Sequence, residues 1–264
     1  MNLQLNNKLV FISGSSMGIG RAIAEAMLAE GARVIVNGRR DMTNLLAELS
    51  RLGTVHGVQG DLSDPAQATK ICSDIDAIGD LDVLVNNVGI FNPRPFADIE
   101  DIEWQSMFDA NIMSTVRLCR HFFPAMLNRD FGRIINISSE AGMRGLESMV
   151  HYSMTKGAQI VIGRGLANLT KGSGKDITVN SVLPGPTLTE GVEKWLKESA
   201  SVEDKTEAQF VSEFFQATEP TSLLQRFIRP EEIANIVTFL ASPLASAING
   251  ASVRAEGGLI KSIG

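Results

Sequence analysis

The sequence predicts a single α/β domain built on a doubly wound parallel sheet of about seven strands, with helices on both faces. Short apolar runs alternate with amphipathic helical segments along all 264 residues, which is typical of strands connected by helices. Neither a linker nor an internal repeat interrupts this alternation, so we expect one domain spanning residues 1–264. A glycine-rich turn directly after the first apolar run supports the same fold class.

That glycine turn is the first candidate binding element. Residues 8–13 (KLVFIS) form an apolar run, and a helical pattern covers residues 19–30. Between them, Gly14, Gly18 and Gly20 would let the backbone turn tightly and approach a pyrophosphate at the positive end of the helix. The spacing is G-x-x-x-G-x-G rather than G-x-G-x-x-G, and an ordinary strand-to-helix turn is the alternative. In this context, we interpret the turn as part of a Rossmann-like dinucleotide site.

The end of the second predicted strand, residues 33–37, bears on the choice of dinucleotide. An acidic residue there would bind the ribose hydroxyls of NAD. The chain instead continues through Gly38 to Arg39 and Arg40, and two guanidinium groups favour a phosphate. This predicts NADP(H) over NAD(H), although two arginines on a surface turn can also be merely solvated.

The third strand is predicted over residues 54–59, after a helix over residues 42–52. It leads to Asp61, whose carboxylate could accept a hydrogen bond from an adenine amino group. Asp61 or Ser63 could equally cap the helix that begins near Pro65. The two roles are compatible.

The middle of the chain contains a fourth strand, a polar turn and a long helix. Residues 81–85 are apolar enough for a strand buried on both faces. The following Asn86 to Gly89 (NNVG) fits close approach by a ligand, but it also suits a plain turn. Residues 103–128 predict one long amphipathic helix. Within it, spacing alone assigns Asn111 a structural role.

A candidate proton-transfer site follows the fifth predicted strand, residues 133–137. Tyr152 and Lys156 lie four residues apart on a predicted helix, so they share one face, and Ser139 approaches from the strand end. A nearby lysine charge lowers the pKa of a phenol far enough for acid–base chemistry near neutrality. Tyr152 is also the single tyrosine of the chain. Y-x-x-x-K alone occurs by chance on exposed helices, so the remaining motifs must support this interpretation.

The last third of the chain has a different pattern. A sixth strand over residues 177–183 ends in Pro184-Gly185-Pro186, and a final strand covers residues 251–255. Between them, residues 187–224 predict two short amphipathic helices separated by a polar, acidic stretch. Because they follow a strand end near the site, we expect a substrate lid, with core or partner surface as the alternatives.

With these motifs in order, the chain resembles the short-chain dehydrogenase/reductase family over essentially its whole length, including members similar to 3-oxoacyl-thioester reductases. SGSSMGIG resembles the family's T-G-x-x-x-G-x-G turn, with Ser13 in place of threonine. NNVG resembles N-N-A-G, ISSEAG with YSMTK matches the catalytic serine and Y-x-x-x-K segments, and PGPTLT resembles the motif that folds over the nicotinamide. One departure is Met17, which stands where many NADP-using members carry a basic residue.

The resemblance implies a catalytic tetrad of Asn111, Ser139, Tyr152 and Lys156. Tyr152 would exchange a proton with the substrate oxygen, Lys156 would lower the tyrosine pKa and hold the nicotinamide ribose, Ser139 would bind the substrate oxygen, and Asn111 would position a relay water. The predicted cofactor contacts, taken from the turn and the matched motifs together, are Gly14, Ser16, Met17, Gly18, Ile19, Gly20, Arg39, Arg40, Asp61, Leu62, Asn87, Gly89, Tyr152, Lys156, Pro184, Gly185, Thr187 and Thr189.

Composition disfavours other partners. The net charge is −6, and the longest Lys/Arg cluster is Arg39-Arg40, so we expect neither nucleic-acid nor membrane binding. Cys72 and Cys119 lack metal-ligand spacing, so no metal site is predicted. The N-terminus lacks a signal-peptide pattern, and no apolar run approaches the length of a membrane span, which favours a soluble, cytoplasmic protein.

The main functional hypothesis is an NADP(H)-dependent oxidoreductase that interconverts a carbonyl and a secondary alcohol. The alternatives are an NAD-linked alcohol dehydrogenase of the same family and a non-catalytic, dinucleotide-binding regulatory protein. Family membership implies a homo-oligomer, tetramer or dimer, which the apolar Phe122-Phe123-Pro124 stretch fits. We expect a hydrophobic small-molecule substrate, because the candidate pocket residues are largely apolar: Phe91, Asn92, Glu140, Met143, Leu146, Met149, His151 and Trp195.

Overall fold

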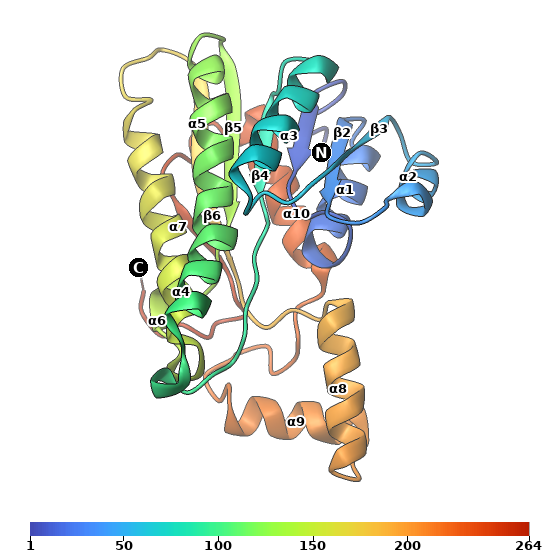
Figure 1. Cartoon of the computed structure of the whole chain (residues 1–264), viewed down its shortest axis with the longest axis vertical. Helices are drawn as coiled ribbons and strands as arrows, with labels where there is room; N and C mark the ends of the chain where they lie inside the picture. Colours follow the sequence, from blue (N-terminus) through green and yellow to red (C-terminus); the bar gives the residue numbers. More distant parts are fainter. Residues whose placement is uncertain (264) are drawn as a thin grey trace.

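A computed structural model describes residues 1–263 and shows a parallel sheet of seven strands with helices on both faces (Figure 1). The strand order is β3-β2-β1-β4-β5-β6-β7, which confirms the predicted doubly wound class. The strands are β1 (Leu9–Ile12), β2 (Arg33–Gly38), β3 (Val55–Gln59), β4 (Val83–Asn86), β5 (Phe131–Ile137), β6 (Asp176–Pro184) and β7 (Ser252–Ala255).

The helices form two layers. On one face of the sheet, α1 packs against α10, and on the other face α3, α5 and α7 form the covering layer. The α-helices are α1 (Gly18–Ala29), α2 (Thr43–Leu49), α3 (Pro65–Ile78), α4 (Asp101–Phe108), α5 (Ser114–Leu127), α6 (Ala141–Arg144), α7 (Val150–Asn168), α8 (Glu190–Val202), α9 (Glu207–Ala217) and α10 (Pro230–Ala241).

Strand β1 is buried on both faces, which explains its continuous apolar sequence. In β1, Val10 and Ile12 join the cluster beneath α1 and α10, whereas Leu9 and Phe11 join the cluster beneath α3 and α5. Successive side chains of a strand point to opposite faces, so a strand covered on both sides needs apolar residues at every position. The parallel register pairs Val10 with Val34 of β2.

The predicted long helix over residues 103–128 is confirmed as one helical segment, but a π-helical turn that the sequence did not predict lies within it. The structure has α4, then a π-helical turn (Asp109–Met113), then α5. The π-turn contains Asn111, whose side chain turns inward and exchanges hydrogen bonds with the backbone of Ile90. A wider turn of this kind disturbs the regular i→i−4 ladder, and the Asn111 carbonyl accepts a hydrogen bond from a side chain of α7.

Helix α3 begins at Pro65, as predicted, but its cap differs from the prediction. Its N-cap is Asp64, whose carboxylate accepts from the Gln67 backbone N–H at 2.8 Å. Neither Asp61 nor Ser63 is the cap. Instead, Asp61 Oδ1 accepts from the backbone N–H and the hydroxyl of Ser63, which stabilises the turn before the helix.

Residues 187–224 contain the two predicted helices, α8 and α9. They project from the lower end of the molecule as viewed in Figure 1. A small separate core formed by Leu196, Phe215 and Phe227 holds them together. This core is distinct from the two clusters that cover the sheet. Helices α8 and α9 therefore pack as a small separate unit at the edge of the domain.

Candidate active site

The glycine turn lies between β1 and α1, at the point where the strand order reverses between β1 and β4. Gly14 and Gly18 have φ values of 61° and 58°, in the left-handed region that favours glycine. A Cβ on Gly20 would lie 2.5 Å from Asn87 Nδ2 and 2.6 Å from the Gly14 carbonyl oxygen. The sequence therefore needs glycine here for backbone conformation and for close packing.

Asn87 holds this turn in place. Its Nδ2 donates to the carbonyl oxygens of Ser13 and Gly14 at 3.0 and 2.9 Å. In return, the buried Ser13 Oγ accepts from the backbone N–H groups of Asn87 and Val88. The serine that replaces the family's threonine thus keeps the hydroxyl that joins the ends of β1 and β4.

The backbone N–H of Gly18 marks an anion-binding position. It donates to Glu190 Oε2 at 2.9 Å, at the N-terminus of α1. Helix N-termini bind carboxylate and phosphate oxygens alike, through free N–H donors and the helix dipole, so this N–H can bind either group. Next to it, the predicted contacts Ser16 and Met17 are exposed and Ile19 is half-buried. The turn therefore fits the pyrophosphate of a dinucleotide.

The two arginines after β2 are exposed at the same edge of the sheet. Arg39 Nη1 lies 3.7 Å from Asp61 Oδ2. Burial alone would raise the pKa of Asp61, but hydrogen bonds from Ser63 and the charge of Arg39 bring it below its usual value. Both arginines are therefore accessible to a ligand phosphate. Leu62, another predicted contact, places its side chain in the core, so a ligand could meet only its backbone.

The segment after β6 closes this region from the other side. Thr187 Oγ1 donates to the Gly185 carbonyl oxygen at 2.8 Å, which orders the chain after Pro184. Thr189 then lies against the glycine turn, since a Cβ on Gly18 would be 3.2 Å from Thr189 Cγ2. The motifs that are far apart in the sequence thus meet around one groove.

The four predicted tetrad residues lie together at the carboxyl edge of the sheet. Ser139 follows β5, Tyr152 is in the first turn of α7, and Lys156 is one turn later. The Tyr152 hydroxyl is hydrogen-bonded with the Ser139 side chain, and the Tyr152 ring packs edge-on against Phe91, with ring centroids 6.1 Å apart. The Tyr152 hydroxyl and the Ser139 hydroxyl therefore form a pair that can bind one substrate oxygen.

Lys156 is buried and firmly held. Its Nζ donates to the Ile137 carbonyl oxygen at 2.8 Å and to Gln159 Oε1 at 3.1 Å, and it lies 5.7 Å from the centroid of the Tyr152 ring. Burial lowers the pKa of Lys156 to about 7. A Cβ on Gly89 would lie 3.1 Å from this ammonium, so glycine leaves the space in front of it open.

Asn111 is fixed by a network that spacing did not reveal. Its Nδ2 donates to Thr155 Oγ1 at 3.0 Å in addition to the Ile90 backbone. The backbone carbonyl oxygen of Asn111 accepts from Gln159 Nε2 at 2.9 Å. Gln159, which the sequence reasoning missed, therefore contacts both Asn111 and Lys156. The available signal was its position three residues after Lys156, on the same face of the helix.

The environment of Tyr152 disfavours the phenolate when no ligand is bound. Exclusion of water raises the pKa of Tyr152, the negative charge of Glu140 raises it further, and the hydrogen bond with Ser139 lowers it. A positive charge near the hydroxyl is needed to reverse this effect. Lys156 is the cation on the same helix face.

The predicted pocket is less apolar than expected. Glu140 is buried beside Ser139 and pairs with Arg144, which also pairs with the buried Glu219. His151 is fully buried and packs edge-on against Trp104, so it does not line an open pocket. The sequence pattern could not distinguish a charged side chain facing solvent from one facing the site.

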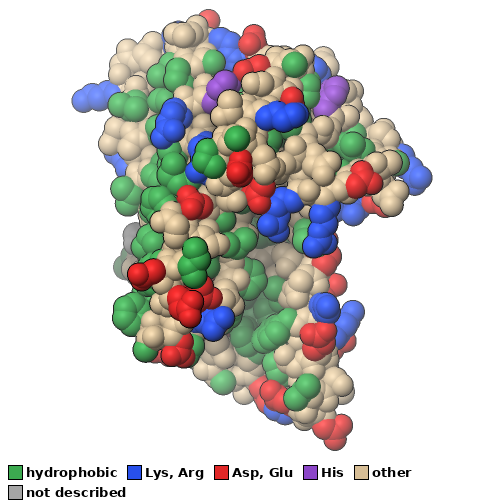
Figure 2. All heavy atoms as spheres, viewed as in Figure 1, with side chains coloured by type: hydrophobic (Ala, Val, Ile, Leu, Met, Phe, Trp, Pro, Cys, Tyr) green, Lys and Arg blue, Asp and Glu red, His purple; other side chains and the backbone are tan. Residues whose placement is uncertain are grey.

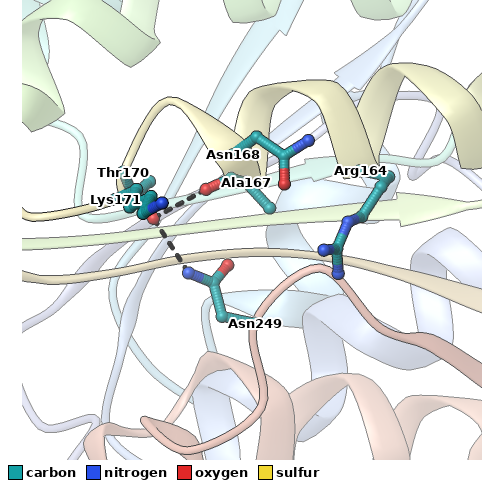
Figure 3. A pocket seen from close by; sticks show the side chains of 6 residues that line it. All are labelled: Arg164, Ala167, Asn168, Thr170, Lys171 and Asn249. Atoms are coloured by element: carbon teal, nitrogen blue, oxygen red, sulfur yellow. Dashed lines mark hydrogen bonds between the residues drawn. The ribbon is translucent and has the colours of Figure 1, made fainter.

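The surface is hollowed between the main body and the α8–α9 segment (Figure 2). Two other hollows lie elsewhere. One, of about 440 Å³, is lined by Arg164, Ala167, Asn168, Thr170, Lys171 and Asn249 (Figure 3). Arg164 is twelve residues after Tyr152, or about 18 Å along the helix axis, so this hollow is remote from the tetrad. The other, of about 500 Å³, borders Arg94 and Glu147.

Among residues 1–263, no group of three or more His, Cys, Asp and Glu side chains could hold a metal ion. In the same part of the chain, every helix is too short or too polar to cross a membrane. Cys72 and Cys119 are buried as free thiols.

A dinucleotide-type turn and a Ser–Tyr–Lys–Asn group at one sheet edge define an oxidoreductase of the dehydrogenase and reductase class. The family model for short chain dehydrogenases matches residues 8–200, and the chain belongs to the short-chain dehydrogenase/reductase family. It is 51% identical to the uncharacterized oxidoreductase YvrD of Bacillus subtilis, over the full length of both.

More distant relatives have assigned activities. The chain is 31% identical to the 3-oxoacyl-[acyl-carrier-protein] reductase FabG of Aquifex aeolicus, covering 98% of this chain and 100% of that protein. Among solved structures, L-sorbose reductase from Gluconobacter frateurii, complexed with NADPH and L-sorbose, matches with a TM-score of 0.92. That match has 28% identity and covers 100% of both chains. These similarities confirm the family and the fold that the sequence predicted.

Proposed function

We propose that the protein is an NADP(H)-dependent oxidoreductase that interconverts a carbonyl and a secondary alcohol. The observation that carries the proposal is the arrangement of Ser139, Tyr152 and Lys156 beside a glycine turn whose Gly18 N–H already binds a carboxylate oxygen. When bound, the nicotinamide cofactor supplies or accepts the hydride. The chain must then exchange one proton with the substrate oxygen and bind that oxygen during the reaction.

Tyr152 is the proposed acid and base. In reduction its hydroxyl gives a proton to the carbonyl oxygen, and in oxidation its phenolate takes the proton back. Ser139 binds the same oxygen, and the Lys156 ammonium stabilises the phenolate and binds the ribose hydroxyls of the cofactor. Asn111 supports this group through its hydrogen bonds to Ile90 and Thr155, which fix the π-turn beside α7.

Replacement of Tyr152 by Phe tests the chemical role. It removes one oxygen atom, so we expect loss of turnover by at least about 1,000-fold with NADPH affinity changed less than about 3-fold. Ser139→Ala should lower kcat/KM less, because Tyr152 still donates to the substrate oxygen. A Tyr152→Phe enzyme with near-normal turnover would contradict the assignment.

We propose that Arg39 and Arg40 cause a preference for NADP(H). Both are exposed at the end of β2, where a 2′-phosphate would lie. The NADPH complex of L-sorbose reductase supports this choice of cofactor. Fluorescence titration with NADPH and NADH provides the test. Arg39→Ala should weaken NADPH binding at least about 10-fold and NADH binding little. The control Arg51→Ala, at an exposed site after α2, should change the affinity for neither cofactor. Tighter binding of NADH by the wild type would instead favour an NAD-linked dehydrogenase.

Residues 187–224 are the proposed substrate lid, and two contacts support this role. Glu190 reaches the glycine turn, and Glu219 pairs with Arg144 beside the tetrad.

We also propose that the protein acts on a small molecule in the cytoplasm as a tetramer or dimer. Large apolar side chains such as Ile102 and Val161 are 68% and 72% exposed, which fits subunit contacts. Light scattering after size-exclusion chromatography would measure the subunit number, and a monomer would contradict this last point.

A further inference from the structure

Glu140 is a buried carboxylate directly beside the catalytic serine. It is 5% exposed, and Ser139 Oγ donates a hydrogen bond to its Oε2. Arg144 Nη2 donates to the other carboxylate oxygen at 3.0 Å. Buried carboxylates are rare unless they are paired. The position of this one, one hydrogen bond from the substrate-binding hydroxyl, indicates a role in the site.

Arg144 does not neutralise this charge by itself, because it is shared. Its guanidinium makes a bidentate pair with Glu219, at 2.7 and 2.9 Å, and Glu219 is also buried. The cluster thus contains two carboxylates and one guanidinium, with one negative charge in excess. That charge reaches the reacting oxygens, since it contributes to the raised pKa of Tyr152.

The hydrogen bonds of Ser139 impose a condition on the substrate. A serine hydroxyl has one proton, and here Ser139 donates it to Glu140 while its oxygen accepts from the Ala141 N–H at 3.1 Å. A ketone oxygen can only accept. When Ser139 turns its proton to such an oxygen, Glu140 loses a donor, and an unpaired buried acceptor is unfavourable.

A hydroxyl group next to the carbonyl removes this conflict. Oxygens on adjacent carbons are about 3 Å apart, close to the length of one hydrogen bond. When the substrate carbonyl accepts from Ser139, the neighbouring hydroxyl can therefore donate to Glu140 and replace the serine proton. Every buried polar group then keeps a partner. Binding of an anionic substrate is unfavourable, because its charge is repelled by the excess negative charge of the cluster.

We infer that Glu140 determines substrate specificity and selects neutral carbonyl compounds that carry a hydroxyl on the carbon next to the carbonyl. The inference rests on the proposed function, because it assigns the substrate class of the same site. It adds a polar requirement to the hydrophobic substrate expected from the sequence. Glu140 binds the substrate hydroxyl, and Arg144 with Glu219 holds the carboxylate in position.

The test compares three four-carbon carbonyl compounds with NADPH: acetoin, which has the adjacent hydroxyl, butanone, which lacks it, and acetoacetate, which is anionic. We expect kcat/KM of the wild type to be at least about 10-fold higher for acetoin than for the other two. Glu140→Gln should lower kcat/KM for acetoin about 10-fold and change kcat/KM for butanone less than about 3-fold. The ratio of kcat/KM for acetoacetate to that for acetoin should rise. The control Glu147→Gln removes the same charge from an exposed site in the same segment and should leave all three unchanged.

The outcomes separate this inference from the proposed function. Equal kcat/KM for acetoin and butanone in the wild type would overturn the inference alone, and this measurement needs no variant to fold. A preference for acetoin that survives Glu140→Gln, in a variant that still binds NADPH, would also overturn it. If NADPH binds but none of the three compounds is reduced, the proposed function fails together with the inference.

Discussion

Lys156 Nζ lies 3.1 Å from Gln159 Oε1, and the amide nitrogen of the same Gln159 donates to the Asn111 carbonyl oxygen. Both side chains are buried, so one amide joins two members of the candidate tetrad. The family resemblance implies a relay water at Asn111, whereas here the carbonyl of that residue already has a protein partner. We therefore interpret Gln159 as a positioning residue that holds Lys156.

Gln159→Leu is expected to lower kcat about 10-fold, equivalent to about 1.4 kcal/mol in activation free energy. Leucine has a similar size but gives Lys156 Nζ no acceptor, so the ammonium is less well fixed beside Tyr152. We expect the kcat–pH profile to shift and NADPH affinity to change less than about 3-fold. Gln105→Leu, on the exposed face of α4, is the matched control. An unchanged pH profile in Gln159→Leu would mean that the residue has only a packing role.

Lys156 also makes a pH-dependent contribution to stability. Burial lowers its pKa from 10.5 to about 7 in the folded protein, so between these values the unfolded chain binds more protons and stability rises with pH. Lys156→Met removes this titration. The free energy of unfolding of the wild type relative to the variant should therefore increase by about 2 kcal/mol from pH 7 to pH 9. Urea unfolding at fixed protein concentration measures this free energy. A difference between wild type and variant that does not depend on pH would contradict the lowered pKa of Lys156.

The sequence was sufficient for the sheet and for the pair on α7, for physical reasons. Strand β1, buried on both faces, has apolar residues at every position, and β4 has them at its first three positions. This pattern is visible without any tertiary information. Tyr152 and Lys156 share a helix face because their spacing matches the helical period. Both signals are local, so local patterns recover them.

The rest of the site depends on contacts between distant residues. Spacing alone did not identify Asn111, because an asparagine in an amphipathic helix has no distinct spacing. The family resemblance implied its role, and its bonds to Ile90, 21 residues away, are visible only in the structure. The charge cluster is similar, since Arg144 and Glu219 are 75 residues apart. Exposed and buried glutamates look identical in sequence. The sequence therefore named Glu140 as a pocket residue without showing that it is buried and paired.

At the other end of the sheet, the buried Arg133 forms an ion pair with Asp176, whose side chain is 35% exposed. Arg133 Nη2 contacts both carboxylate oxygens of Asp176 at 2.7 and 2.8 Å, and the arginine side chain is 0% exposed. Asp176→Asn leaves a buried cation without a counter-charge, so the free energy of unfolding should fall by about 3 kcal/mol. The pair lies at the amino end of β6, away from Tyr152, so kcat should not change in the folded variant.

The matched control for this pair is Asp74→Asn. Its partner Lys70 lies at 2.6 Å, but the two side chains are 39% and 71% exposed. Exposed pairs of this kind contribute about 0.5 kcal/mol or less. Thermal or urea unfolding of both variants checks the contrast, and equal losses would show that burial is not the cause.

Glu190 competes with the cofactor for the N–H of Gly18. Its carboxylate oxygen lies 2.9 Å from that nitrogen, at the position proposed for the pyrophosphate, so binding must break this contact and bring like charges together. Glu190→Gln should therefore tighten NADPH binding about 3- to 5-fold, or about 0.6–1 kcal/mol for an exposed interaction. Because exposed charges are screened by salt, the gain should shrink as ionic strength rises. Glu193→Gln, on the same helix and exposed, removes an equal charge without touching Gly18 and should have no comparable effect. Weaker NADPH binding by Glu190→Gln would show instead that the carboxylate supports the bound state, for example by holding residues 187–224 against the turn.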